Sequence, residues 1–406
     1  MTTIPNLSIH ELLERECLVT YLQPLVSMNR KSLIGFEALS RAIDPRDGKL
    51  IPPVALFSMC EDLQDLTLLD RSCRKKAFET FAPISRENRS LLLSVNIDAA
   101  VINHETINHG ITAKMVSSCG IPANNIVIEI IESKAGSDKA LSSFVEKSRT
   151  NGFLIALDDV GTGHSNLDRI PRLLPDIIKI DRSLITDIHK KFHNQAVTRS
   201  LIDLAERTGS LPLAEGIETV DEALTLMSMG IDVFQGYFFG KPGPANTALD
   251  YDNKSIKLLA SKFKTHMLEK LNHQKIRENS YKRLTAKLRE ALMDGMPNTA
   301  DSILSSFITD NSNIECAYIL DTHGIQISET ICNPYKLMEN RRLIYQPAPS
   351  GADHSLKEYY LTIKAGKNWN STASYISLAS GNNCVTVSTK LYDTPKSPIL
   401  CIDIST

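Results

Sequence analysis

The sequence predicts an α/β protein: a closed barrel of β/α units, then a long helix and a small α+β domain. Apolar strands alternate with helical stretches from Leu18 to Pro242, which is typical of parallel β/α units. Eight such strands precede Pro242, and eight is the number that closes a β/α barrel. A doubly wound open sheet is the alternative, but no Gly-x-Gly-x-x-Gly follows the first strand.

Each element follows from the spacing of its apolar residues. The predicted strands are 18–26, 33–38, 91–96, 126–132, the run that begins at Phe153, 177–181, 211–217 and 233–239. The predicted helices are 9–16, two within 54–82, one that reaches Cys119, 136–150, 165–173, 190–208 and 220–229. Residues 44–53 are rich in turn formers and are predicted as a loop.

The chain changes character after Pro242. Residues 245–253 form a polar linker, and residues 255–294 lack Pro and Gly and predict one long basic helix. Such a helix suits a nucleic acid or a membrane surface, but a connector or dimer helix is the favoured interpretation. A helix at 299–308 and strands at 317–320, 325–330, 359–364, 375–379, 384–390 and 399–404 complete the tail. The predicted domains are 1–244, 245–295 and 296–406.

The composition excludes several classes of protein. A chain of 406 residues is too long for one ordinary core, and its net charge of −2 gives no reason to expect DNA or RNA as a partner. Its eight cysteines include no Cys-x-x-Cys pair, which argues against a thiolate zinc site and a disulfide framework. No apolar run approaches the ~20 residues that span a bilayer, and no signal peptide is apparent. We expect a cytoplasmic protein.

Polar side chains mark the ends of the predicted barrel strands. Seven strands carry one each: Glu37, Asn96, Glu129, Asp158, Lys179, Glu215 and Gln235. Strand ends converge on the carboxyl-terminal rim of a β/α barrel, where active sites are built. A purely structural role is the alternative, but each residue would then need its own buried partner.

Asp158 and Asp159 are the strongest chemical signal, because two adjacent carboxylates end an apolar strand and repel each other. A divalent cation such as magnesium would bind such oxygen ligands. The alternative is that one aspartate caps the next helix and the other is solvated. Acidic ligands with an asparagine amide favour Mg²⁺ or Mn²⁺ over zinc.

These residues resemble the EAL domain family of cyclic di-GMP phosphodiesterases. The signature is Glu37-Ala38-Leu39-Ser40-Arg41, and further matches follow in family order. They are Gln23-Pro24, Val95-Asn96, Glu129-Ile130-Ile131-Glu132, Asp158 to Gly163, Lys179-Ile180-Asp181, Ala214 to Glu218, and Gln235-Gly236-Tyr237. The resemblance implies a barrel with one reversed strand and hydrolysis of cyclic di-GMP to linear pGpG by two Mg²⁺ or Mn²⁺ ions.

The resemblance also implies roles for single residues. Glu37, Asn96, Glu129 and Asp158 would bind one metal, and Asp158, Asp159 and Glu215 the other. Lys179 would hold the attacking water, with Glu37 and Glu215 as further catalytic residues. Substrate contacts would come from Gln23, Leu39, Arg41, Asp181 and Gln235, and Glu132 would steady the loop after Asp159. Ile131, Val160 and His164 depart from the family's common residues, which puts the rate and the order of this loop in doubt.

Two functional alternatives remain beside the enzyme. The barrel could be a receptor that binds cyclic di-GMP without cleaving it, or a glycosidase with two carboxylates on a barrel. The glycosidase would not need the asparagine, the Asp158-Asp159 pair and the lysine together. The tail resembles PAS-like sensor modules in layout, which leaves its ligand unknown. A plain dimerisation module is the alternative, and we expect a homodimer.

Overall fold

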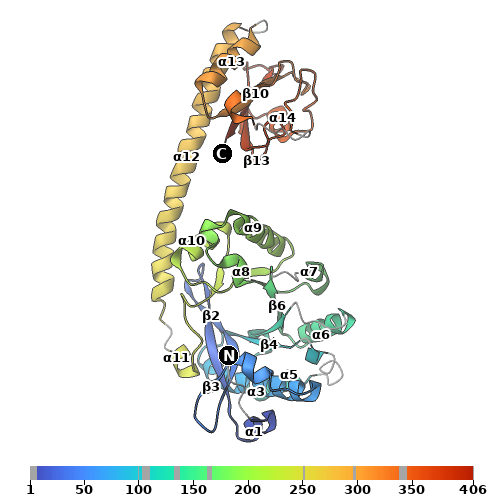
Figure 1. Cartoon of the computed structure of the whole chain (residues 1–406), viewed down its shortest axis with the longest axis vertical. Coiled ribbons are helices and arrows are strands. Elements are labelled where there is room, and N and C mark those ends of the chain that lie inside the picture. The colour runs from blue at the N-terminus through green and yellow to red at the C-terminus, as the bar shows by residue number, and fades with distance from the viewer. Residues whose placement is uncertain are drawn as a thin grey trace. The chain divides into compact units, whose positions relative to one another are not determined.

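The computed structural model describes residues 7–98, 100–102, 110–131, 138–161, 167–249, 252–295, 299–337 and 345–405. It divides into two compact units, one ending at Leu268 and the other beginning at Glu269 (Figure 1). The division falls inside α12 (Lys254–Gly295), the predicted long helix. No helix in the described ranges combines the length and the apolar character that a membrane span requires.

The first unit is a closed barrel, as predicted. Its eight strands are β1 (Leu18–Ser27), β2 (Ser32–Ile43), β4 (Leu92–Ile97), β5 (Ile126–Ile131), β6 (Leu154–Val160), β7 (Ile177–Ile180), β8 (Leu211–Ala214) and β9 (Val233–Gln235). Neighbours from β2 through β4 to β9 pair in parallel. β1 closes the ring by pairing antiparallel with both β2 and β9. The single reversed strand that the family resemblance implies is therefore confirmed.

The reversal of β1 follows from the length of its connection. Only residues 28–31 join β1 to β2, which suffices for a hairpin but not for a crossover to a parallel strand. Lys31 in this turn has a φ of 54°, in the left-handed region. β3 (Leu50–Ile51) extends the sheet beside β2, within the segment predicted as a loop.

Helices pack on the outside of the barrel (Figure 1). They are α1 (Ile9–Glu14), α2 (Pro53–Phe57), α3 (Leu63–Glu87), α5 (Ile111–Ser118), α6 (Asp138–Thr150), α7 (Arg169–Leu173), α8 (Arg182–Ile185), α9 (Phe192–Arg207) and α10 (Val220–Met229). A further helix, α11 (Ala245–Leu249), forms in the segment predicted as a linker. Ile256 and Leu259 at the start of α12 are buried in the same outer core.

The second unit is a six-stranded antiparallel sheet with helices. It comprises α13 (Ala300–Asp310), β10 (Ile314–Leu320), β11 (Ile331–Cys332), α14 (Glu358–Lys364), β12 (Trp369–Ser371), β13 (Tyr375–Ile376), β14 (Asn383–Lys390) and β15 (Ile399–Ser405). The strand order is β11-β10-β15-β14-β12, with β13 also on β14. Leu288 and Leu292 of α12 bury against one face of this sheet, together with α13.

Three predictions for the tail were wrong. Residues 359–364 were expected as a strand but form helix α14, because Tyr359, Tyr360 and Ile363 bury together at helical spacing. Residues 325–330 make only isolated bridges in place of a strand. Cys316 and Cys332 form a disulfide between β10 and β11, where the sequence had indicated none.

Candidate active site

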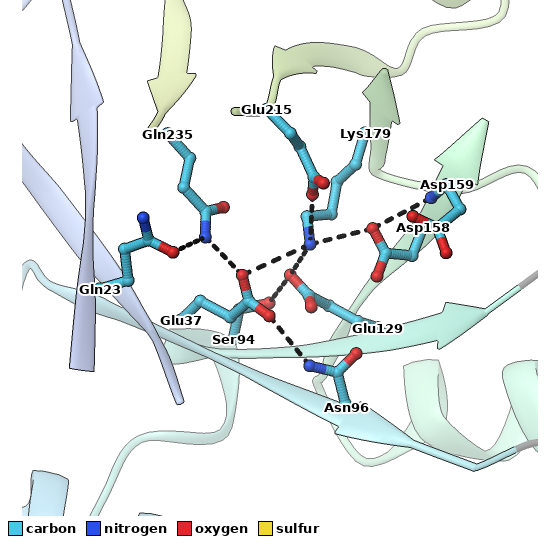
Figure 2. A network of polar contacts seen from close by, with 10 residues as sticks. All are labelled: Gln23, Glu37, Ser94, Asn96, Glu129, Asp158, Asp159, Lys179, Glu215 and Gln235. Carbon is cyan, nitrogen blue, oxygen red and sulfur yellow. Dashed lines mark hydrogen bonds and ion pairs between the residues drawn. The ribbon is translucent and has the colours of Figure 1, made fainter. Parts of the chain in front are cut away.

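The interior of the barrel places an apolar layer beneath a polar one. The apolar layer consists of Leu25, Val127, Ala156, Ile177, Leu213 and Val233. Side chains alternate between the two faces of a strand, so the residue two positions further along also points inward. On the parallel strands these next inward positions are Glu129, Asp158, Lys179, Glu215 and Gln235. The predicted polar residues therefore converge at the carboxyl ends of the strands (Figure 2).

Lys179 lies at the centre of this cluster, with 2% of its side chain exposed. Its Nζ is 2.6 Å from Glu215 Oε1, 3.0 Å from Asp158 Oδ1 and 3.0 Å from Glu129 Oε1. Glu37 Oε2 is 3.7 Å away (Figure 2). One ammonium group thus faces four carboxylates that come from β2, β5, β6 and the end of β8.

Three amide side chains orient Glu37. Asn96 Nδ2 donates to Glu37 Oε1 at 3.0 Å, and Gln235 Nε2 donates to Glu37 Oε2. The same Gln235 nitrogen donates to Gln23 Oε1 at 3.0 Å, and Gln23 donates to the Gly240 carbonyl at 3.3 Å. β1, β2, β4 and β9 are tied together by this chain of hydrogen bonds, which fixes the position of the carboxylate.

Without added cations, the site disfavours the charged forms of its buried acids. Burial, with the nearby Glu37 carboxylate, raises the pKa of Glu129 to about 8, and burial raises the pKa of Glu215 well above its usual value. Burial opposes the charge of Lys179, but the carboxylates of Asp158, Glu129 and Glu215 outweigh it and raise the Lys179 pKa. One lysine does not neutralise four buried acids, so the site favours further positive charge.

The donor set fits divalent cations. One oxygen each from Asp158, Asp159 and Glu215 lie within 4.8 Å of one another. Glu129 Oε2 is buried without a hydrogen-bond partner, as expected of an atom reserved for a ligand. Asp159 has a φ of 56°, a left-handed conformation that costs an aspartate about 1–2 kcal/mol and that is typical of functional sites.

The remaining predicted residues lie around this cluster. Leu39 lines a cavity of about 400 Å³ together with Glu37, Asn96 and Asp158. Arg41 lies further along β2, with its guanidinium 5.9 Å from the Tyr21 ring centroid. Asp181 Oδ1 accepts a hydrogen bond from the Ser183 amide at 2.8 Å and caps α8. Glu132 lies outside the described residues.

Two features of the site were not predicted from the sequence. Ser94 Oγ donates to Glu129 Oε1 at 2.5 Å, and its place two positions before Asn96 on the same strand could have revealed it. Asp70 and Arg74 form a buried ion pair on α3, 2.6 Å apart, at the wall of the cavity that Leu39 lines. The i,i+4 spacing of Asp70 and Arg74 in the sequence indicates an ion pair on one helix. Only the fold shows that this ion pair faces the site.

Fold and site together define a barrel protein with a carboxylate-rich rim suited to divalent cations. A model of the EAL domain matches residues 7–242. The chain belongs to the EAL domain family.

Several relatives are named as cyclic di-GMP phosphodiesterases. The probable cyclic di-GMP phosphodiesterase PdeI of Escherichia coli is 31% identical over 241 residues, which are 58% of this chain and 30% of PdeI. The cyclic di-GMP phosphodiesterase RocR of Pseudomonas aeruginosa is 28% identical over 57% of this chain and 59% of RocR. The chain thus spans less than two thirds of these curated relatives.

Two solved structures extend the comparison. The Bacillus subtilis YkuI protein, an EAL domain protein in complex with cyclic di-GMP and calcium, covers 98% of this chain with a TM-score of 0.82. The chain in turn covers 99% of YkuI, and at 23% identity this likeness shows the fold alone, including that of the tail. Klebsiella pneumoniae BlrP1, in a manganese and cyclic di-GMP complex, is 28% identical over 56% of each chain, with a TM-score of 0.51.

Proposed function

We propose that this chain hydrolyses cyclic di-GMP to linear pGpG with two divalent cations, Mg²⁺ or Mn²⁺. The observation that carries this proposal is the convergence of Glu37, Glu129, Asp158 and Glu215 on one buried lysine. Family membership and the names of the relatives support the substrate. The bound complexes of BlrP1 support the cation class.

Each cation would have its own ligand set. Glu37, Asn96 and Glu129 would bind one cation, Asp159 and Glu215 the other, and Asp158 would bridge the two. Asn96 donates its amide nitrogen to Glu37, and its amide oxygen is the atom that would bind the cation. Two such cations supply charge screening for the phosphodiester, a lowered pKa for a bound water and stabilisation of the leaving oxygen.

The chain's own residues do the remaining work. Lys179 keeps its proton and donates to the attacking water, which favours the hydroxide form of that water. Gln23 and Gln235 fix Glu37 in place, and the guanidinium of Arg41 can hold a phosphate oxygen through two donors. The burial of Lys179 and Glu129 excludes bulk water, which strengthens each of these interactions.

The test is an assay of the purified chain with cyclic di-GMP and MnCl₂ or MgCl₂, with pGpG measured by chromatography. We expect pGpG in both metals and none in excess EDTA. Glu37→Gln and Lys179→Met should each lower the rate at least about 100-fold, because each removes a group of the reacting site. Glu79→Gln, on the exposed face of α3, is the matched control.

Binding of cyclic di-GMP without pGpG in any metal would contradict the proposal and assign the chain to the receptors. Hydrolysis that persists in EDTA would contradict the role of the cations.

We also propose a homodimer, since Leu268, Leu271 and Ile276 on α12 are each more than half exposed. Sedimentation equilibrium is the measurement, and a mass of 45.0 kDa at all concentrations would refute the dimer.

A further inference from the structure

The second unit contains a cavity of about 530 Å³ that the proposed phosphodiesterase does not use. It lies on the face of the sheet opposite the core that α12 and α13 cover, because Tyr318 and Cys401 point there while Ala317 and Ile402 point to the helices. Helix α14 contributes Tyr359 to its wall. This volume is in the range of small-molecule sites.

A buried carboxylate lies at the base of this cavity. Asp403 on β15 lines it with 3% of the residue exposed, and Thr386 Oγ1 donates to Asp403 Oδ1 at 2.7 Å. Within the described ranges no lysine or arginine forms an ion pair with Asp403. Burial raises the pKa of Asp403 to about 7, as expected of a carboxylate that lacks a cation.

Three tyrosines and a histidine contribute to the walls of the cavity. Tyr318, Tyr359 and Tyr375 line it, and the Tyr318 and Tyr359 ring centroids are 6.3 Å apart at 69°. His354 is held by two hydrogen bonds, at 2.7 Å to Tyr359 Oη and at 3.0 Å to Gln326 Oε1. Burial lowers the His354 pKa, so this ring is neutral at pH 7.

The charges at the mouth are predominantly negative. Asp353 and Glu358 line the cavity against a single Lys357. Together with Asp403 they disfavour an anion and favour a cation. Tyrosine faces attract cations through the ring quadrupole, and the attraction is strongest where water is excluded.

We propose that this cavity binds a small organic cation, an amine or a guanidine, whose charged N–H group pairs with Asp403 while its hydrocarbon part packs against Tyr318, Tyr359 and Tyr375. A cationic ligand would supply Asp403 with the positively charged partner that no lysine or arginine of the described ranges provides. The three tyrosines supply contact area without a competing charge.

The test is calorimetric titration of the 406-residue chain with phenethylamine, histamine and agmatine, and with phenylacetate as the anion matched in size to phenethylamine. We expect at least one of the three cations to bind and phenylacetate not to bind. Asp403→Asn should weaken cation binding at least about tenfold, because it replaces a charge-assisted hydrogen bond by a neutral one. Glu290→Gln, at an exposed acid on α12 outside the cavity lining, should leave it unchanged.

A second pair of variants avoids the buried positions. Leu378 lines the cavity and is 57% exposed, so substitutions there preserve the fold. Leu378→Lys should weaken cation binding and Leu378→Glu should not. The proposal is overturned if none of the three cations binds, if phenylacetate binds as tightly, or if Leu378→Lys and Leu378→Glu bind the cation equally.

Discussion

At the scale of single residues, Lys179 is the group on which we expect the stability of the metal-free barrel to depend. It is the cation that the four surrounding acids share, and it is 2% exposed. Removing one partner from a buried ionic cluster leaves uncompensated charge, which costs several kcal/mol. The same residue is therefore both a proposed catalytic group and a structural one.

Lys179→Met should lower the free energy of unfolding in EDTA by about 3–5 kcal/mol, as measured by urea unfolding followed by circular dichroism. Added MnCl₂ should restore part of this loss, because cations replace the missing charge. Lys75→Met removes an exposed pair with Glu79 on α3 and should change the free energy by less than about 0.5 kcal/mol. If Lys179→Met is as stable as the wild type in EDTA, the four acids do not need the Lys179 charge for the barrel to be stable.

Replacing Glu129 should have the opposite effect on stability: the metal-free barrel should become more stable while function is lost. Glu129→Gln keeps an oxygen that can accept from Ser94 but removes an acid whose charged form is disfavoured by burial and by the Glu37 carboxylate. We expect the metal-free barrel to gain about 1 kcal/mol in EDTA, while Mn²⁺ affinity and hydrolysis fall. Parallel urea unfolding and Mn²⁺ titration measure both effects. Unchanged Mn²⁺ affinity would remove Glu129 from the proposed ligand set.

At the scale of single elements, the barrel strands position the site because their side chains alternate between the inside and the outside of the barrel. The pairing of an apolar and a polar inward residue on β5, β6 and β7 is visible in the sequence as Val127 with Glu129, Ala156 with Asp158 and Ile177 with Lys179. Strand alternation fixes which residues face inward, so these site residues were predictable. Asp70 and Arg74 were not predicted, because a helix offers no comparable indication of which neighbour it faces.

Asp403 on β15 should make the stability of the second unit depend on pH. The pKa of Asp403 is about 7 in the folded state, above its ordinary value of 3.8 in an unfolded chain. The folded state therefore binds the proton more tightly, and the stability is full below pH ~4 and falls as the pH rises through 7, by up to about 4 kcal/mol.

Trp369 on β12 is the chain's one tryptophan, so its fluorescence follows unfolding of this unit in the intact protein. Asp403→Asn should abolish the dependence between pH 4 and pH 7. An equal slope in both proteins would show that other groups cause it.

α12 should contribute to the second unit through buried leucines near its end. Leu288 and Leu292 are fully buried in that unit's core. Leu288→Ala should lower the free energy of unfolding reported by Trp369 by about 2–5 kcal/mol. Leu361→Ala, at a position 48% exposed, is the control and should cost far less. Equal effects would contradict the assigned packing of the helix.

At the scale of the whole molecule, the two units have separate cores among the described residues. The outer barrel core includes Ile256 and Leu259, and the core of the second unit includes Leu288 and Leu292. All four lie on α12, so this one helix contributes to both cores. Units with separate cores unfold as separate cooperative transitions unless they are strongly coupled.

Urea unfolding should therefore show more than one transition by circular dichroism and a single transition by Trp369 fluorescence. MnCl₂ should shift only the transition that the tryptophan does not report, because a ligand stabilises the state that binds it. Coincident transitions by both probes, shifted together by Mn²⁺, would contradict this division.

The sequence by itself determined the barrel and the polar residues at the ends of its strands, because strand alternation and residue type are local properties. It also determined the long helix, which needs only apolar spacing without Pro or Gly. Tertiary structure alone decided that residues 359–364 are a helix. The spacing of Tyr359, Tyr360 and Ile363 does not distinguish a helix from a strand, and only their packing together against the sheet selects the helix. Tertiary structure alone also placed Asp403 beneath three tyrosines, because residues distant in sequence meet only when the sheet and its covering segments pack.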